Sequence, residues 1–141
     1  MGSPPTQSTI SLAAQILILI LLGYAYTLAR KKRYKIHAYV TSLALVLHIL
    51  VVVYVMIPVI IYGYGAYSRI YSTFYVANIT LHALSGALTI VTGSFLVLKW
   101  IIRKYDVRSC LKKTQMRIVL TLWLLSIFTG IIVYMSWFVT Q

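Results

Sequence analysis

Two histidines lie deep within long apolar stretches of the sequence, and these are the side chains best placed to do chemistry. His48 and His82 belong to different stretches. A helix rises about 1.5 Å per residue, which places His48 about 20 Å, and His82 about 25 Å, from the basic residues that border their stretches. We therefore expect the two imidazoles at similar depth on neighbouring antiparallel helices.

Two facing imidazoles in a helical bundle are compatible with three arrangements. Neutral imidazoles can supply both axial ligands of a b-type haem while apolar side chains enclose the porphyrin. The same pair could hold copper, although two nitrogens without a nearby Cys or Met make an incomplete copper site. In the third arrangement, His82 forms a hydrogen bond with His48 or Asn78 and joins the helices without a cofactor. His48 and His82 are thus the candidate haem or metal ligands, and these alternatives stay open.

His37 is predicted to have a different role from the deeper pair. It is eleven residues from His48, which returns a helix to within about 20° of its starting direction, so both face the same way. His37 lies, however, only two residues after Lys35, the last basic residue of the stretch 30–35. About 20 Å of helix height separates His37 from His82. We expect a solvated residue at the membrane edge that does not share their ligand.

Small and polar residues form stripes on two of the apolar stretches. Six of them recur at helical spacing and fall on one face: Asn78, His82, Ser85, Gly86, Thr89 and Gly93. Ser126 and Gly130 form a second small-xxx-small pattern of the kind that lets helices pack closely. These stripes are expected to close the bundle and to offer a docking seam. Arg69, which lies outside both basic clusters, is expected to contact an acidic partner or a haem propionate.

The elements that position these residues follow from hydropathy and charge. The chain has 141 residues, of which 61% are hydrophobic and 10% charged, so lipid must surround most of it. Twelve of its 13 Lys and Arg residues fall in residues 30–35 and 99–117. Basic loops stay cytoplasmic, which predicts four spans over residues 11–29, 36–62, 72–98 and 118–139, with both termini outside. The expected fold is all-α: a single-domain antiparallel four-helix bundle in the plasma membrane.

The same features argue against several functions. The net charge of +12 is explained by basic residues that meet anionic lipid headgroups, so no nucleic-acid partner is expected. The only acidic residue is Asp106, in the second basic stretch, so the chain lacks paired carboxylates, a catalytic triad and a proton relay. We expect no enzymatic activity. Cys110, the sole cysteine, is expected to be a free thiol.

Several short motifs resemble the CtaM-like family of small four-helix membrane proteins of bacteria and archaea. The resemblance rests on the basic residues 31–33 followed by these positions: His37, His82, Trp123, Thr129, Gly130 and Tyr134. It implies a respiratory setting, as an assembly factor or accessory subunit of a haem–copper terminal oxidase, or a role in its haem and copper supply. Family members often carry another histidine before the fourth helix, where this chain has Cys110, Leu111 and Lys112.

Two other functions compete with this expectation. One is a purely structural subunit whose small-residue stripes dock neighbouring helices of a larger membrane complex. The other is a diffusing electron carrier between quinol and an oxidase. Whether the purified chain is red or colourless separates the structural function from those that need a haem.

Overall fold

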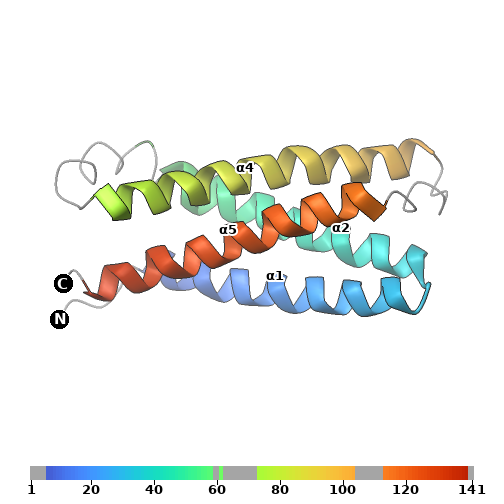
Figure 1. Cartoon of the computed structure of the whole chain (residues 1–141), viewed down its shortest axis with the longest axis horizontal. Helices are drawn as coiled ribbons and strands as arrows, with labels where there is room; N and C mark the ends of the chain where they lie inside the picture. Colours follow the sequence, from blue (N-terminus) through green and yellow to red (C-terminus); the bar gives the residue numbers. More distant parts are fainter. Residues whose placement is uncertain (1–5, 59–60, 62–72, 104–112, 140–141) are drawn as a thin grey trace.

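Four long helices account for most of the chain. The computed structural model describes residues 6–58, 61, 73–103 and 113–139. Helix α1 spans Thr6–Arg30 and α2 spans Tyr34–Val51, continued by a π-helical turn, η1, over Val52–Met56. Helix α4 spans Thr73–Ile102 and α5 spans Lys113–Val139. Successive helices run in opposite directions, and α1 begins at the end of the bundle where α5 ends (Figure 1).

The helices pack as two pairs. Contacts are most extensive between α1 and α2 and between α4 and α5, whereas the two pairs meet along a thinner seam where α1 touches α5 and α2 touches α4. The apolar core along this seam consists of Ile18, Leu22, Ala44, Leu45, Val119, Trp123 and Ile127. Lipid tails are as apolar as these side chains, so close van der Waals packing and polar contacts must hold the pairs together.

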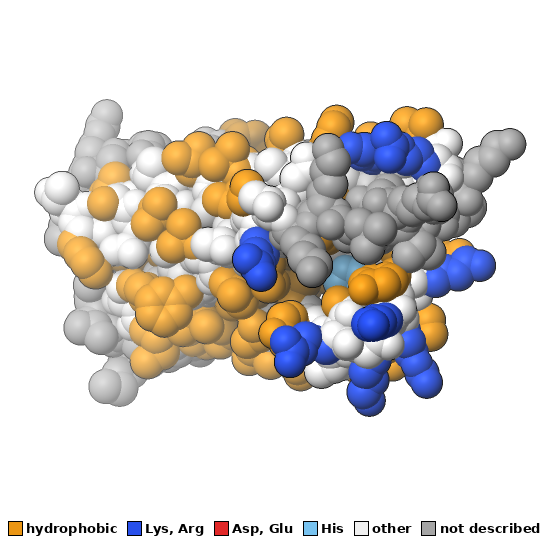
Figure 2. All heavy atoms as spheres, turned by 45° about the vertical axis from the view of Figure 1, so that its right-hand side comes forward, with side chains coloured by type: hydrophobic (Ala, Val, Ile, Leu, Met, Phe, Trp, Pro, Cys, Tyr) orange, Lys and Arg blue, Asp and Glu red, His pale blue; other side chains and the backbone are white. Residues whose placement is uncertain are grey.

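The outer surface of the bundle is suited to lipid. Each of the four helical segments is long and apolar enough to cross a membrane, and only 22% to 33% of its most apolar stretch is buried inside the protein. The described Lys and Arg side chains gather toward one end (Figure 2). These features confirm the expected multi-pass membrane protein with four helical spans.

Most hydroxyl groups in the helices are satisfied locally. Each of these side chains donates to the carbonyl oxygen four residues earlier, at 2.6 to 2.9 Å: Thr41, Ser42, Thr80, Thr89, Thr92, Thr129 and Ser136. Such bonds let Ser and Thr sit in an apolar medium without another partner. Ser126 differs, because its Oγ is buried without a hydrogen-bond partner.

The helices extend past the predicted spans at several ends. Helix α1 already runs from Thr6 and α4 continues to Ile102, because a polar residue marks the edge of the hydrocarbon and does not itself end a helix. In the second span, the N–H of Ile57 bonds the carbonyl of Val52, five residues earlier. Pro58 follows at once; its ring would clash with the carbonyl of Tyr54 in a regular helix, and the widened turn relieves that clash.

Lys32 ends α1 in a backbone conformation that usually belongs to glycine. Its φ is 58°, the only positive value among the described non-glycine residues. Its N–H bonds the carbonyl of Ala29 at 3.1 Å, and the N–H of Arg33 bonds that of Leu28 at 2.9 Å. This is the Schellman arrangement, in which a left-handed residue closes the helix.

We expect Lys32→Gly to raise the free energy of unfolding by about 1 kcal/mol, because a side chain in the left-handed region costs about 1 to 2 kcal/mol. Titration with a denaturing detergent would measure the change. Lys31→Gly is the matched control, since Lys31 has no positive φ and should gain nothing. Equal effects of the two substitutions would contradict the proposed strain.

Candidate functional site

His82 is buried in α4 and is held in one orientation by α5. Its Nδ1 donates a hydrogen bond of 2.8 Å to the carbonyl oxygen of Ser126. A carbonyl oxygen only accepts, so Nδ1 carries the proton, and in the neutral ring Nε2 carries the lone pair. Thr129 supports this geometry: its Oγ1 lies 3.5 Å from His82 Nδ1 and also donates to the Ser126 carbonyl at 3.1 Å.

His48 reaches the same region from α2. The residue is 5% exposed, and its buried Nε2 makes no well-formed hydrogen bond, although the ring lies close to the backbone of Gly86. Its ring packs edge-on against Trp123 of α5, with ring centroids 5.7 Å apart. A buried polar group left without a good hydrogen bond costs up to about 1 to 3 kcal/mol, so His48 is held here at some expense of stability.

Gly86 shows how closely the two helix pairs approach at this level. A Cβ on Gly86 would lie 3.7 Å from His48 Nε2 and 3.3 Å from Ser126 Oγ. His48 Nε2 and Ser126 Oγ therefore face the same small region beside α4, one helical turn from His82. Five of the six residues of the stripe on α4 are buried: His82, Ser85, Gly86, Thr89 and Gly93.

Gln15 of α1 completes this polar cluster, and its place was not predicted from the sequence. The residue is 7% exposed, its Nε2 donates weakly to Ser11 Oγ at 3.5 Å, and its Oε1 has no partner. A Cβ on Gly130 would lie 2.6 Å from Gln15 Oε1 and 2.8 Å from His82 Cε1. An amide in an otherwise apolar span was the signal that could have revealed it.

The polar cluster, formed by Gln15, His48, His82 and Ser126, lies on the seam between the two helix pairs. Gln15 and His48 come from the α1–α2 pair, and His82 and Ser126 from the α4–α5 pair. The structure therefore brings together the two predicted ligands. Their alternative hydrogen-bond partners are not used: His82 Nδ1 bonds Ser126 rather than His48 or Asn78.

The other residues singled out in the sequence do not belong to the polar cluster. Asn78 is half-buried and donates to the carbonyl of Phe74 in its own helix, at 2.9 Å. Trp123 is 1% exposed, and its Nε1 has no partner. Tyr134 is half-buried near the end of α5. Arg69, Asp106 and Cys110 lie outside the described residues.

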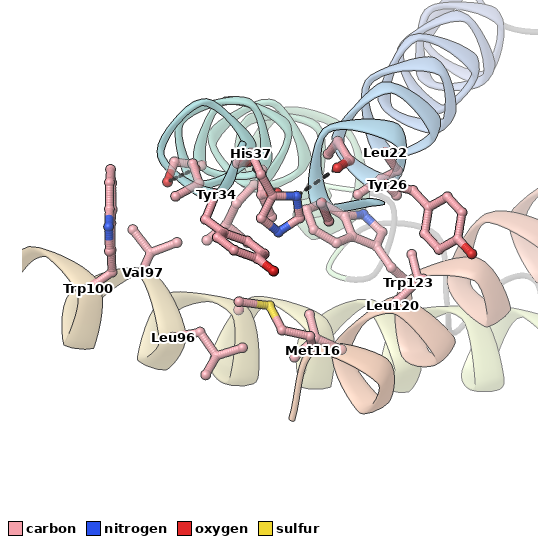
Figure 3. A pocket seen from close by; sticks show the side chains of 18 of the residues that line it. Leu22, Tyr26, Tyr34, His37, Leu96, Val97, Trp100, Met116, Leu120 and Trp123 are labelled. Atoms are coloured by element: carbon pink, nitrogen blue, oxygen red, sulfur yellow. Dashed lines mark hydrogen bonds between the residues drawn. The ribbon is translucent and has the colours of Figure 1, made fainter. Parts of the chain in front are cut away.

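His37 is not the solvated edge residue that we expected. It is half-buried, and its Nδ1 donates to the carbonyl of Ala25 in α1 at 2.8 Å. Its ring reaches into a cavity of about 520 Å³ that all four long helices line (Figure 3). His48 and His82 do not line this cavity, which lies toward the basic end of the bundle. The cavity could not be predicted from any one stretch of the sequence, because its lining comes from four different helices.

The available ligands are few. Within residues 6–58, 61, 73–103 and 113–139, no three His, Cys, Asp or Glu side chains come together in a metal-binding group. A metal held here would depend on the imidazoles of His48 and His82.

The chain matches no known protein family, no curated protein and no solved structure.

Proposed function

We propose that this chain is a non-catalytic membrane protein of the respiratory chain, an assembly factor or accessory subunit of a haem–copper terminal oxidase in the plasma membrane. We further propose that His48 and His82 bind a b-type haem between α2 and α4. One observation supports the site most: the buried Nε2 of His48 makes no well-formed hydrogen bond and lies beside Gly86, one helical turn from His82, whose ring α5 orients.

The donor set fits a haem. His82 has its Nδ1 proton on a backbone carbonyl, which leaves Nε2 as the ligating nitrogen. Such a bond to the second ring nitrogen fixes the tautomer and raises the basicity of the ligand. His48 directs its Nε2 toward the same region from the facing helix, and this nitrogen can act as a ligand when the ring proton is on Nδ1. A haem held by two imidazoles supplies one-electron transfer.

A porphyrin between His48 and His82 would have to enter the seam between the two helix pairs. Gly86 and Ser126 already lie against His48, so a porphyrin needs the α1–α2 pair to move away from the α4–α5 pair. The contacts within each pair are far more extensive than those across the seam. Separation at the seam therefore leaves both closely packed pairs intact.

The competing function is a structural subunit without a cofactor. It is favoured by the bond from His82 to Ser126 and by the close approach of helices at Gly86 and Gly130. In that case, water molecules satisfy the free atoms of the polar cluster, and the buried histidines only join the helix pairs. The two functions differ in whether the purified chain carries a haem.

Purification in a mild detergent tests the respiratory role. We expect the tagged chain to copurify with oxidase subunits and deletion of its gene to lower oxidase activity. The control is an unrelated four-span protein that carries the same tag, which should not recover the oxidase. A partner-free chain whose loss leaves oxidase activity unchanged would refute both the assembly and the subunit versions.

We also propose that the basic end faces the cytoplasm and that both termini are outside, because basic loops are retained on the cytoplasmic side. In a Cys110→Ser background, a cysteine at Lys31 should react with a membrane-impermeant thiol reagent only after the cells are opened. A cysteine at Thr73, at the opposite end of the bundle, should react in intact cells. The reverse labelling pattern would show that the orientation is inverted.

A further inference from the structure

We propose that the cavity at the basic end is a binding site for one anionic phospholipid, whose phosphate lies at the mouth and whose apolar part enters the bundle. This inference is independent of the proposed haem site, because none of the polar cluster lines the cavity. We refer to it as the basic-end cavity.

The walls of the basic-end cavity suit an apolar chain. Aliphatic side chains from all four long helices line it: Leu22 of α1, Leu45 of α2, Leu96 and Val97 of α4, and Leu120 of α5. The rings of Trp100 and Trp123 also line it. Its volume of about 520 Å³ falls within the range of about 300 to 1,000 Å³ typical of small-ligand pockets.

The mouth of the cavity carries three cations. Arg30 and Lys32 at the end of α1 and Arg117 near the start of α5 line it. The single acidic residue of the chain, Asp106, lies outside the described residues, so no acidic side chain in the described part neutralises these cations. Figure 2 shows Lys and Arg side chains around apolar ones and a histidine at this end. Basic pockets between membrane helices are suited to anionic headgroups.

Two further features place polar groups where a headgroup would lie. The Nδ1 proton of His37 is used by the Ala25 carbonyl, so in the neutral ring the other nitrogen is free to accept a hydrogen bond from a headgroup hydroxyl. Lys32 adopts its left-handed conformation although glycine would be less strained there. A lysine at this position keeps a cation at the mouth, which glycine could not.

Native mass spectrometry of the purified full chain tests the site, with phosphatidylglycerol as the anionic probe and phosphatidylcholine as the neutral one. The cavity variant replaces Arg30, Lys32 and Arg117 with Gln. Its matched control replaces Lys31, Lys35 and Arg103 with Gln. These three residues do not line the cavity, and their replacement removes the same amount of charge from the same end of the bundle.

We expect one tightly held phosphatidylglycerol on the wild type and on the control variant. The cavity variant should bind it about 100-fold more weakly, since each of the three cations contributes about 1 kcal/mol near an anionic lipid and about 1.4 kcal/mol corresponds to tenfold. Lys32→Gly should weaken lipid binding even though it is expected to stabilise the fold.

A filling variant separates the cavity from the surface charge. Ala29 lines the cavity and is half-buried, so Ala29→Trp should occupy the space and abolish tight binding without any change in charge. Ser42→Leu, at another half-buried lining position, serves if the first variant does not fold. Equal losses in the two charge variants, unchanged binding in a folded filling variant, or equal binding of both lipids would each overturn the proposal.

Discussion

Gly130→Ala is expected to lower the free energy of unfolding by about 2 kcal/mol, because overpacking of a close-packed interior costs about 1 to 3 kcal/mol. The added Cβ would lie 2.8 Å from Cε1 of His82 and 2.6 Å from Oε1 of Gln15. The amide of Gln15 can swing aside. The ring of His82 cannot turn without losing its 2.8 Å bond to Ser126, so α4 and α5 must shift.

Gly23→Ala is the matched control for this experiment. Gly23 lies in α1, and a Cβ there meets nothing within 4 Å. Alanine is a better helix former than glycine by about 1 kcal/mol, so this variant should be at least as stable as the wild type. Titration from a mild to a denaturing detergent would compare both variants. If Gly130→Ala were as stable as Gly23→Ala, the close contact at the polar cluster would be wrong.

The second large effect is expected in the haem content of histidine variants. His48→Ala and His82→Ala should each lose the haem absorption band, because a six-coordinate b-type haem needs both imidazoles. His37→Ala should keep the band, since His37 faces the basic-end cavity and not the polar cluster. Absorption spectra of the purified variants, matched for protein concentration, measure the effect.

The three histidine variants also serve as controls for one another. Loss of the band in His37→Ala alone would move the haem to the basic-end cavity, where the thioether of Met116 also lines the wall. Retention of the band after loss of either deep histidine would contradict the pairing of His48 with His82. A wild type without any band would favour the structural function.

The fold was largely predictable from charge and hydropathy. The basic residues 30–35 and 99–117 separate apolar runs that become the four spanning helices. Counting helical rise also predicted His48 and His82 at similar depth, and His48 Nε2 lies beside Gly86, one helical turn from His82. The helix ends were less predictable, since helices such as α4 continue beyond the apolar run, and the π-helical turn before Pro58 depends on backbone geometry.

The environment of the site could not be predicted in the same way. The bond from His82 to the Ser126 carbonyl depends on how α4 and α5 are aligned, which no local pattern specifies. Gln15 joins the polar cluster because α1 meets α5 across the seam. The burial of His37 was missed for a related reason, because its ring turns toward α1, where the carbonyl of Ala25 accepts a hydrogen bond from Nδ1.

Magnetic circular dichroism of the purified wild-type chain in the near infrared tests the central claim most directly, because it identifies the two axial ligands of a ferric haem. We predict one low-spin haem per chain with two imidazole ligands, as His48 and His82 require. A histidine–methionine signal would place the haem in the basic-end cavity, and a colourless chain purified from haem-replete cells would show that the polar cluster holds no haem; either result would contradict the proposed site.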